Sequence, residues 1–149
     1  MGRYIAILWI ICRLILGGVM VNGGINKFKS PNPSPMEVLE KAQKFTDIDQ
    51  KETLQKILYI NGARQTDFFW ELLGISEIIF GLLLLIQGTG FVGALFLLPI
   101  TLQVFLFHLF LEPEEWGELI YTALLLSINI AIVLRDYKLW KHLLWVKPI

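Results

Sequence analysis

The stretch from Phe68 to Ile86 is almost entirely apolar and is long enough to cross a lipid bilayer. About 20 apolar residues span the ~30 Å hydrocarbon core, at ~1.5 Å per residue of helix. The stretch nevertheless carries Glu77 near its centre. A lone charge at that depth costs at least ~2.5 kcal/mol, so Glu77 must be protonated, paired or turned toward other parts of the protein. We therefore expect the other apolar segments to supply polar partners for Glu77.

The whole chain is too apolar for a water-soluble domain of its length. Of its 149 residues, 55% are hydrophobic and only 17% are charged, which predicts a single, all-α integral membrane domain over residues 1–149. Basic and acidic residues balance at 13 each, so the chain lacks the positive charge that nucleic-acid binding requires. Cys12 is the only cysteine, which excludes an internal disulfide and a CxxC redox pair.

Four apolar runs predict four membrane-spanning helices, at about residues 4–27, 68–87, 91–111 and 117–136. The polar insertion at about 29–66 contains apolar residues at helical spacing, which predicts two short amphipathic helices over one mouth of the bundle. Asp49, followed three residues later by Glu52, resembles the start of a helix. The insertion is either a ligand-covering lid or a solvated linker. The predicted fold is an integral membrane four-helix bundle with a helical polar insertion between its first and second spans.

The distribution of charge predicts that both termini are cytoplasmic. The turn at 113–118, after the third span, is acidic. Basic residues instead gather at the two ends of the chain, at Arg3, Arg135, Lys138, Lys141 and Lys147. Membrane proteins retain such basic segments on the cytoplasmic side.

Counting from the predicted membrane surfaces places one polar side chain of every span near the same depth, ~12–18 Å from the cytoplasmic side. This predicted midplane layer consists of Arg13, Glu77, Gln103 and Asn129. We expect Arg13 and Glu77 to form an ion pair, because arginine meets a carboxylate through two parallel hydrogen bonds. Gln103 and Asn129 are expected to satisfy the remaining donors and acceptors. The layer either fixes helix packing or binds a ligand or proton, and both roles stay open.

Glycines lie on the same helix face as Arg13 in the first span and as Glu77 in the second. Arg13 and Lys27 fall in one sector of the first span with Gly17 and Gly24. Glu77 similarly shares a sector with Gly74, Gly81 and Gly88. Glycines on facing helices allow the backbones to approach closely, so the first and second spans are expected to make a tight contact.

A second polar layer is predicted near the outer mouth. Its members are Asn22, Asn26, Lys27, Glu71 and His108. We expect Glu71 to orient His108, which gives an imidazole that titrates near neutral pH. One histidine and one carboxylate are too few ligands for a typical metal site, so no metal is predicted. The layer is either a polar lining or a site that handles protons or a ligand.

Two of the four predicted spans resemble a known family in their motifs. The segment Arg13–Gly18, followed by Asn22–Phe28, is similar to the first-helix pattern of the DoxX family, in which Arg-x-x-x-Gly leads to a Gly-x-x-Lys-aromatic ending. Glu77 with Gly81–Leu85, followed by Gly88–Gly90, resembles the second-helix motif of that family. The positions carried over by this resemblance are Arg13, Gly17, Lys27, Glu77 and Gly81.

The resemblance implies a four-helix bundle in a bacterial inner membrane, surrounded by lipid. Because the family includes the small membrane subunit of thiosulfate:quinone oxidoreductase, it implies a polar layer that holds a lipophilic ligand, with quinone as the candidate, or supports a redox partner protein. The chain carries no self-contained catalytic constellation, so an enzymatic role is left open. The alternatives are a structural or assembly protein without a ligand, and a small-solute or proton transporter. The insertion at 29–66 is longer than the usual connector of the family.

Overall fold

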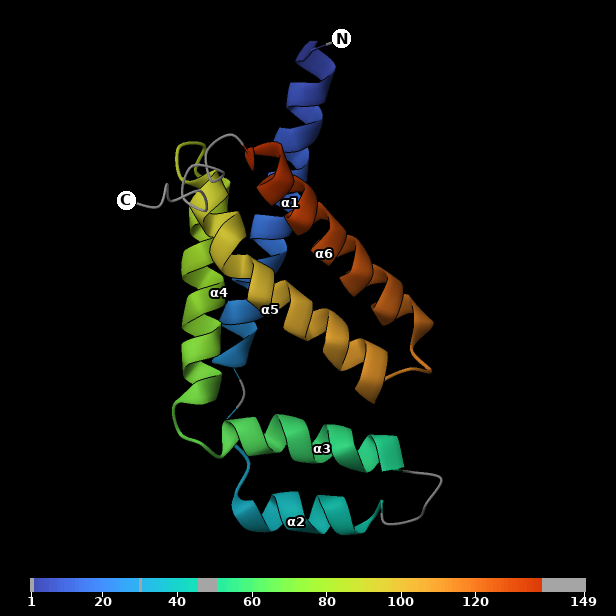
Figure 1. Cartoon of the computed structure of the whole chain (residues 1–149). Coiled ribbons are helices and arrows are strands. Elements are labelled where there is room, and N and C mark those ends of the chain that lie inside the picture. Colours follow the sequence, from blue (N-terminus) through green and yellow to red (C-terminus); the bar gives the residue numbers. More distant parts are fainter. Residues whose placement is uncertain (1, 30, 46–50, 138–149) are drawn as a thin grey trace, which may run out of the picture.

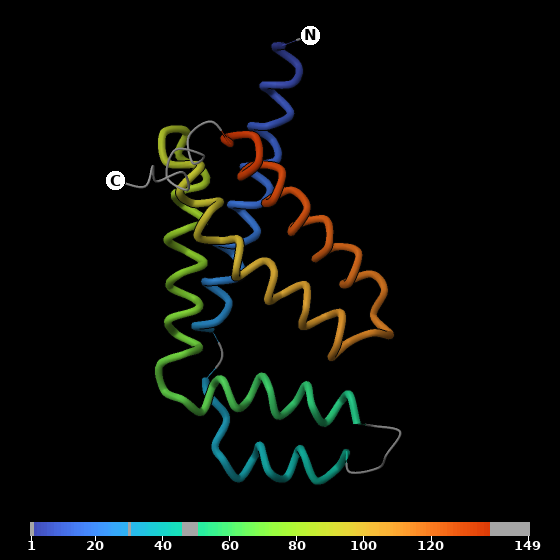
Figure 2. The backbone as a smooth tube through the Cα atoms, viewed as in Figure 1, coloured from blue at the N-terminus to red at the C-terminus, as the bar shows by residue number. Residues whose placement is uncertain are grey.

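The computed structural model describes residues 2–29, 31–45 and 51–137, and this part of the chain is helical with no strand. Figures 1 and 2 show the helices in chain order. They are α1 (Gly2–Lys27), α2 (Pro35–Gln43), α3 (Lys51–Arg64), α4 (Phe69–Leu85), α5 (Gly90–Leu111) and α6 (Trp116–Arg135). The all-α prediction is therefore confirmed for the described residues.

The four long apolar helices begin and end within two residues of the predicted spans. Helices α1, α5 and α6 are each long and apolar enough to cross a membrane on their own. Helix α4 has 17 residues and meets the same test together with α3, from which it is bent by 83°. The described part of the chain thus contains three candidate membrane spans, or four if the bent pair forms one of them.

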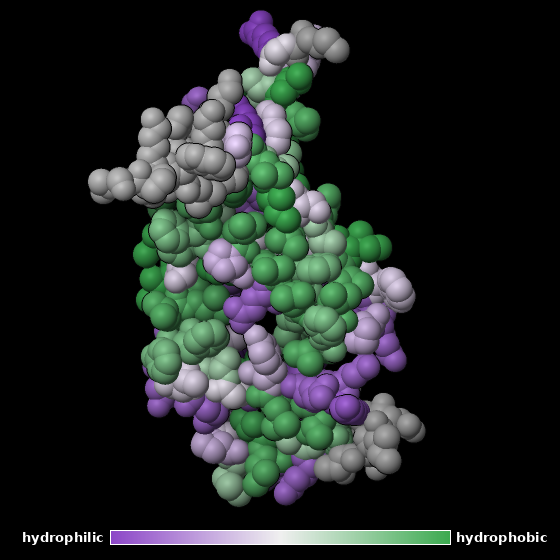
Figure 3. All heavy atoms as spheres, viewed as in Figure 1, coloured by the Kyte–Doolittle hydropathy of each residue, from purple (hydrophilic) through white to green (hydrophobic). Residues whose placement is uncertain are grey.

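The long helices pack in chain order around one apolar core. Helix α4 packs against both α1 and α5, helix α5 against α6, and α6 returns to α1 (Figure 1). The fully or nearly buried core side chains come from all four helices and are Leu16, Met20, Leu84, Ala94, Leu97, Ile100, Leu125, Ile132 and Val133. Apolar side chains also cover the outer faces of α4, α5 and α6, whereas hydrophilic ones gather toward α2 and α3 (Figure 3). An apolar exterior of this kind is expected where lipid replaces water.

Glycines set the contact between α1 and α4, as the sequence predicts. A Cβ atom added at Gly24 would lie 2.6 Å from Gly74 O, and one added at Gly17 would lie 3.0 Å from Gly81 O. The two backbones therefore touch at both places. Gly88 instead lies in the turn after α4, with open space around it, so its prediction as part of this face is wrong.

We expect Gly24→Ala to lower the free energy of unfolding by about 1–3 kcal/mol, because the added methyl group would overlap the α4 backbone. The measurement is unfolding of the protein in micelles by SDS, followed by circular dichroism. Gly18→Ala is the matched control on the same helix, since open space surrounds Gly18, and it should be neutral or stabilising. Equal losses of stability in both variants would contradict the tight contact.

The insertion folds into two short helices, as predicted. Helix α2 packs against α3, and α3 contacts α4 and α5 at the end of the long helices where α1 finishes (Figure 1). Helix α2 begins with a capping box, in which Ser34 accepts from the Glu37 N–H and Glu37 accepts from the Ser34 N–H. This cap was not predicted from the sequence. The helix start that was predicted, at Asp49, lies outside the described residues.

Candidate functional site

Glu77 is buried within α4 and is paired with a cation, although not with the predicted one. Lys27 Nζ at the end of α1 lies 2.6 Å from Glu77 Oε2, and the two side chains are 15% and 4% exposed. A salt bridge and a hydrogen bond thus coincide at a single contact. Lys27, predicted in the outer layer, therefore belongs with the midplane carboxylate.

The predicted ion pair between Arg13 and Glu77 is wrong. The Arg13 guanidinium instead donates hydrogen bonds to Leu84 O at 2.8 and 3.0 Å and to Ile86 O at 2.6 Å. Both acceptors lie at the C-terminal end of α4, about 10–14 Å along the helix axis from Glu77. The first turns of α1 extend beyond the end of α4 (Figure 1), so Arg13 meets the end of its neighbour rather than the centre. Arg13 caps a helix that would otherwise leave carbonyls without donors.

Gln103 does not join Arg13 or Asn129, contrary to the predicted single layer. Its side-chain Nε2 donates to the hydroxyl of Tyr59 at 2.7 Å, which connects α5 to α3. Tyr59 also packs against the ring of Phe107, with the ring centroids 5.7 Å apart. This contact holds one face of the insertion against α5.

Asn129 is fully buried between α5 and α6, away from the other three members of the predicted layer. We assign its amide the orientation that satisfies both ends, in which the nitrogen donates to Ala94 O at 2.9 Å and the oxygen accepts from the Leu98 N–H at 3.1 Å. These bonds satisfy the amide within the helix contact. The described contacts of Asn129 therefore support a role in packing.

The residues of the predicted outer layer do not form one cluster either. His108 Nδ1 lies 2.6 Å from Glu112 Oε2, not beside Glu71, and Glu112 also pairs with Lys56 of α3. Glu71 instead accepts a hydrogen bond from Asn32 at 3.2 Å. The remaining two predicted members, Asn22 and Asn26, are exposed on α1.

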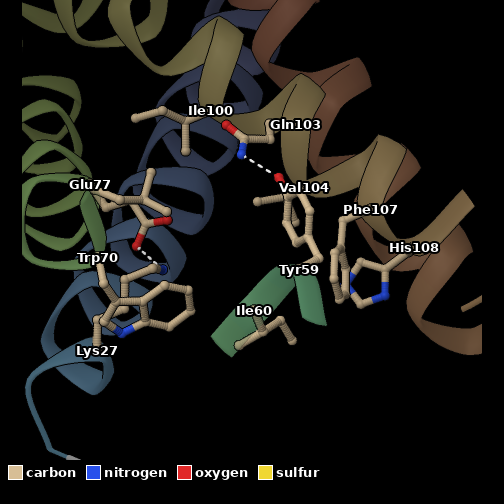
Figure 4. A pocket seen from close by; sticks show the side chains of 11 residues that line it. Lys27, Tyr59, Ile60, Trp70, Glu77, Ile100, Gln103, Val104, Phe107 and His108 are labelled. Carbon is tan, nitrogen blue, oxygen red and sulfur yellow. Dashed lines mark hydrogen bonds and ion pairs between the residues drawn. The ribbon is translucent and has the colours of Figure 1, made fainter. Parts of the chain in front are cut away.

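A cavity of about 260 Å³ lies between the polar residues of α1, α3, α4 and α5. Figure 4 shows Lys27, Glu77 and Trp70 on one side of it and Tyr59, Phe107 and His108 on the other. The residues that line it are Lys27, Tyr59, Ile60, Trp70, Leu73, Glu77, Ile100, Gln103, Val104, Phe107 and His108. The structure thus brings four predicted site residues from both layers around one cavity, whereas Arg13 and Asn129 lie outside its lining.

Three aromatic residues of this cavity, Tyr59, Trp70 and Phe107, were not identified as site residues from the sequence. Trp70 is flanked by cations, with Lys27 Nζ 5.4 Å and Arg64 Cζ 4.9 Å from the ring centroid. Its buried Nε1 has no hydrogen-bond partner among the described residues. Tyr59 follows Lys56 by three residues on α3; Tyr59 contacts α5, and Lys56 contacts Glu112 directly after it. Two long side chains with polar ends, three residues apart on one helix face, are the sequence feature that could have indicated that this face of the insertion contacts the bundle.

Comparison with protein-family models matches residues 8–109 to the DoxX family. The matched range covers more than half of the chain and includes every residue that lines the cavity. No curated protein and no solved structure matches the chain.

Proposed function

Because the chain belongs to the DoxX family, we propose that it is a four-span membrane protein whose cavity beside Lys27 and Glu77 binds the ring of a quinone. In this proposal the chain is a component of a membrane redox system and holds the quinone for a partner protein. The observation that carries the proposal is the cavity itself, in which a buried ion pair meets apolar and aromatic walls. Small-molecule sites commonly combine mainly apolar linings with a few convergent polar groups.

The proposed spans are α1, α4, α5 and α6, with the insertion lying at the membrane surface. The 17 residues of α4 cover about 26 Å, and the apolar residues Phe68 and Ile86 extend it at either end toward the ~30 Å hydrocarbon thickness. We place the protein in a bacterial inner membrane with both termini cytoplasmic, because Arg3 and Arg135 lie toward those ends. The more distal basic residues of the C-terminal cluster lie outside the described residues. The cavity would then open near the outer surface.

Charge favours an uncharged ligand. Lys27 and Glu77 neutralise each other at the cavity wall, so a charged ligand would lack a counter-charge there. Burying such a charge without a partner is costly. His108 lies beside Glu112, which in turn pairs with Lys56, so the other side of the cavity is also occupied by mutually compensating groups. A neutral ring fits this arrangement better than an inorganic anion.

The hydrogen-bonding groups of the cavity lining favour a ring that accepts hydrogen bonds in one redox state and also donates them in the other. An oxidised quinone presents two carbonyl oxygens, which only accept hydrogen bonds, whereas its reduced form carries two hydroxyls that also donate. Lys27 has donors to spare, and Tyr59 accepts from Gln103, which leaves its own hydroxyl hydrogen available. The carboxylate of Glu77 and the amide oxygen of Gln103 are acceptors. The lining therefore has partners for both forms.

The test is binding of a decyl-tailed benzoquinone to the full chain in lipid nanodiscs, measured by quenching of tryptophan fluorescence. Among the tryptophans in the described residues, only Trp70 lies in the cavity lining, so Trp70→Phe should remove the saturable part of the quenching. Gln103→Leu should raise the Kd about five- to tenfold, because it removes both the amide and the restraint on Tyr59.

Gln87→Leu is the matched control, because Gln87 is exposed in the turn after α4 and lies outside the cavity lining. This variant should bind the quinone like the parent protein. No saturable binding by the parent, or equal affinity of the parent and Gln103→Leu, would contradict the proposal. In that event the Lys27–Glu77 pair serves the assembly of the bundle only.

A further inference from the structure

A second hollow lies on the outer side of α5, directly beside the cavity. It is a groove of about 420 Å³, lined mainly by the apolar side chains of α5. Pro99, Leu102, Leu106 and Phe110 form one stripe of this helix and are exposed at the surface. Their spacing of three or four residues keeps them on a single face, over about 16 Å of helix.

The groove and the cavity share part of their walls. Tyr59, Gln103 and Phe107 line both hollows, so the two spaces meet at these side chains. The hydrogen bond between Gln103 and Tyr59 lies at this boundary. The two hollows are therefore adjacent at residues of α3 and α5, whose side chains can change rotamer.

The two hollows differ in volume, and therefore in the part of a ligand that each can accommodate. About 260 Å³ is slightly below the ~300–1,000 Å³ of typical small-molecule sites, which suits a ring without a long substituent. The groove is larger, and its wall is apolar apart from Tyr59 and Gln103 at the boundary. It faces the apolar exterior of α5, where lipid surrounds the helix in the proposed membrane arrangement.

We infer that the groove holds the single hydrocarbon tail of the ligand whose ring occupies the cavity, and that this ligand enters sideways from the bilayer between α3 and α5. The occupant is thus a ring with one long apolar chain. The continuity of the two hollows supports this occupant, because one molecule can fill both only if it is polar at one end and apolar along the rest. This inference rests on the proposed function, since it needs a ring in the cavity.

The test compares two benzoquinones that differ only in their tails, one carrying a decyl chain and one carrying none. Leu106→Trp would fill the groove without touching the cavity lining, because Leu106 lines only the groove. Leu109→Trp is a close control, since Leu109 lies on the same helix outside both hollows and is 37% exposed, compared with 38% for Leu106.

In nanodiscs of one lipid composition, Leu106→Trp should weaken binding of the decyl-tailed quinone at least tenfold and leave the affinity of the tail-less ring unchanged. Leu109→Trp should leave both affinities unchanged. Leu102→Trp provides a second blocked groove, used if thermal unfolding shows that Leu106→Trp is not folded.

If the parent protein binds neither quinone, the proposed function fails. If the parent binds both but blocking the groove affects neither, or affects both equally, the cavity remains a ring site and the tail inference is overturned. A loss of tailed-quinone binding in Leu109→Trp that equals the loss in Leu106→Trp would also overturn it.

Discussion

Lys27→Met is expected to lower the free energy of unfolding by about 3–5 kcal/mol, because it leaves the carboxylate of Glu77 buried without a counter-charge. Glu77 is 3% exposed, so little solvent reaches it to compensate. The substitution retains the unbranched apolar stem of the lysine, which means that the loss reports the missing ammonium group more than missing packing. Unfolding in micelles, followed by circular dichroism, measures the change.

The double variant Lys27→Met, Glu77→Leu separates the cost of an unpaired charge from the value of the pair. Replacing both members of a buried pair with apolar residues of similar size is often neutral, so the double variant should recover most of the stability. Lys41→Met on α2 is the control for losing a lysine, because Lys41 is exposed. A double variant as unstable as Lys27→Met would contradict this account, since no buried charge would then remain to explain the loss.

The helices and their ends follow from the length of the apolar runs. Crossing a bilayer requires about 20 apolar residues, and the four runs in this chain are separated by polar or Gly- and Pro-containing segments. The contact between α1 and α4 could also be predicted from the sequence, because glycines that share a helix face with a charge indicate close helix packing. Both features depend on local sequence spacing.

The partner of Glu77 was predicted wrongly because depth was counted from the membrane surface for each span separately. That count assumes helices that start at one level, whereas α1 has 26 residues and α4 has 17. The glycine contacts give a better register: Gly17 meets Gly81, and Gly24 meets Gly74, in antiparallel helices. Continuing this register places Arg13 opposite the C-terminal end of α4.

The same register places Lys27 opposite the first turn of α4, about nine ångströms from the level of Glu77. Its long side chain then extends toward the carboxylate. Once the two facing glycine pairs are known from the structure, their register distinguishes the two cations, which hydropathy alone does not.

The remaining part of the cavity could not be derived from local spacing. Tyr59 reaches Gln103 only because α3 turns by 83° relative to α4 and lies across the end of α5. Asp67, in the connection between α3 and α4, has a positive φ of 59°, an unusual conformation for a residue other than glycine. The direction of such a bend depends on which surface the amphipathic helix covers, and therefore on the packed bundle.

Arg13→Met is expected to lower the free energy of unfolding by about 3 kcal/mol, because the C-terminal end of α4 loses its charged hydrogen-bond donor. The carbonyls of Leu84 and Ile86, at the end of α4, would then lack this donor. A cation also interacts favourably with the negative end of the helix dipole. Gly90 packs directly on the guanidinium, since an added Cβ would lie 2.6 Å from Arg13 Cζ, so the substitution would also leave space at the start of α5.

Arg3→Met is the matched control, because Arg3 is exposed on the same helix and its loss should not change stability. Unfolding in micelles measures both variants, and hydrogen exchange should rise mainly in residues 84–90. The folded Arg13→Met protein should bind the decyl-tailed quinone with the affinity of the parent, because Arg13 lies outside the cavity lining. Loss of quinone binding without loss of stability would instead show that Arg13 contributes to the ligand site. That result would contradict the assignment of Arg13 to the helix cap at one end of α4, away from the cavity near the other end.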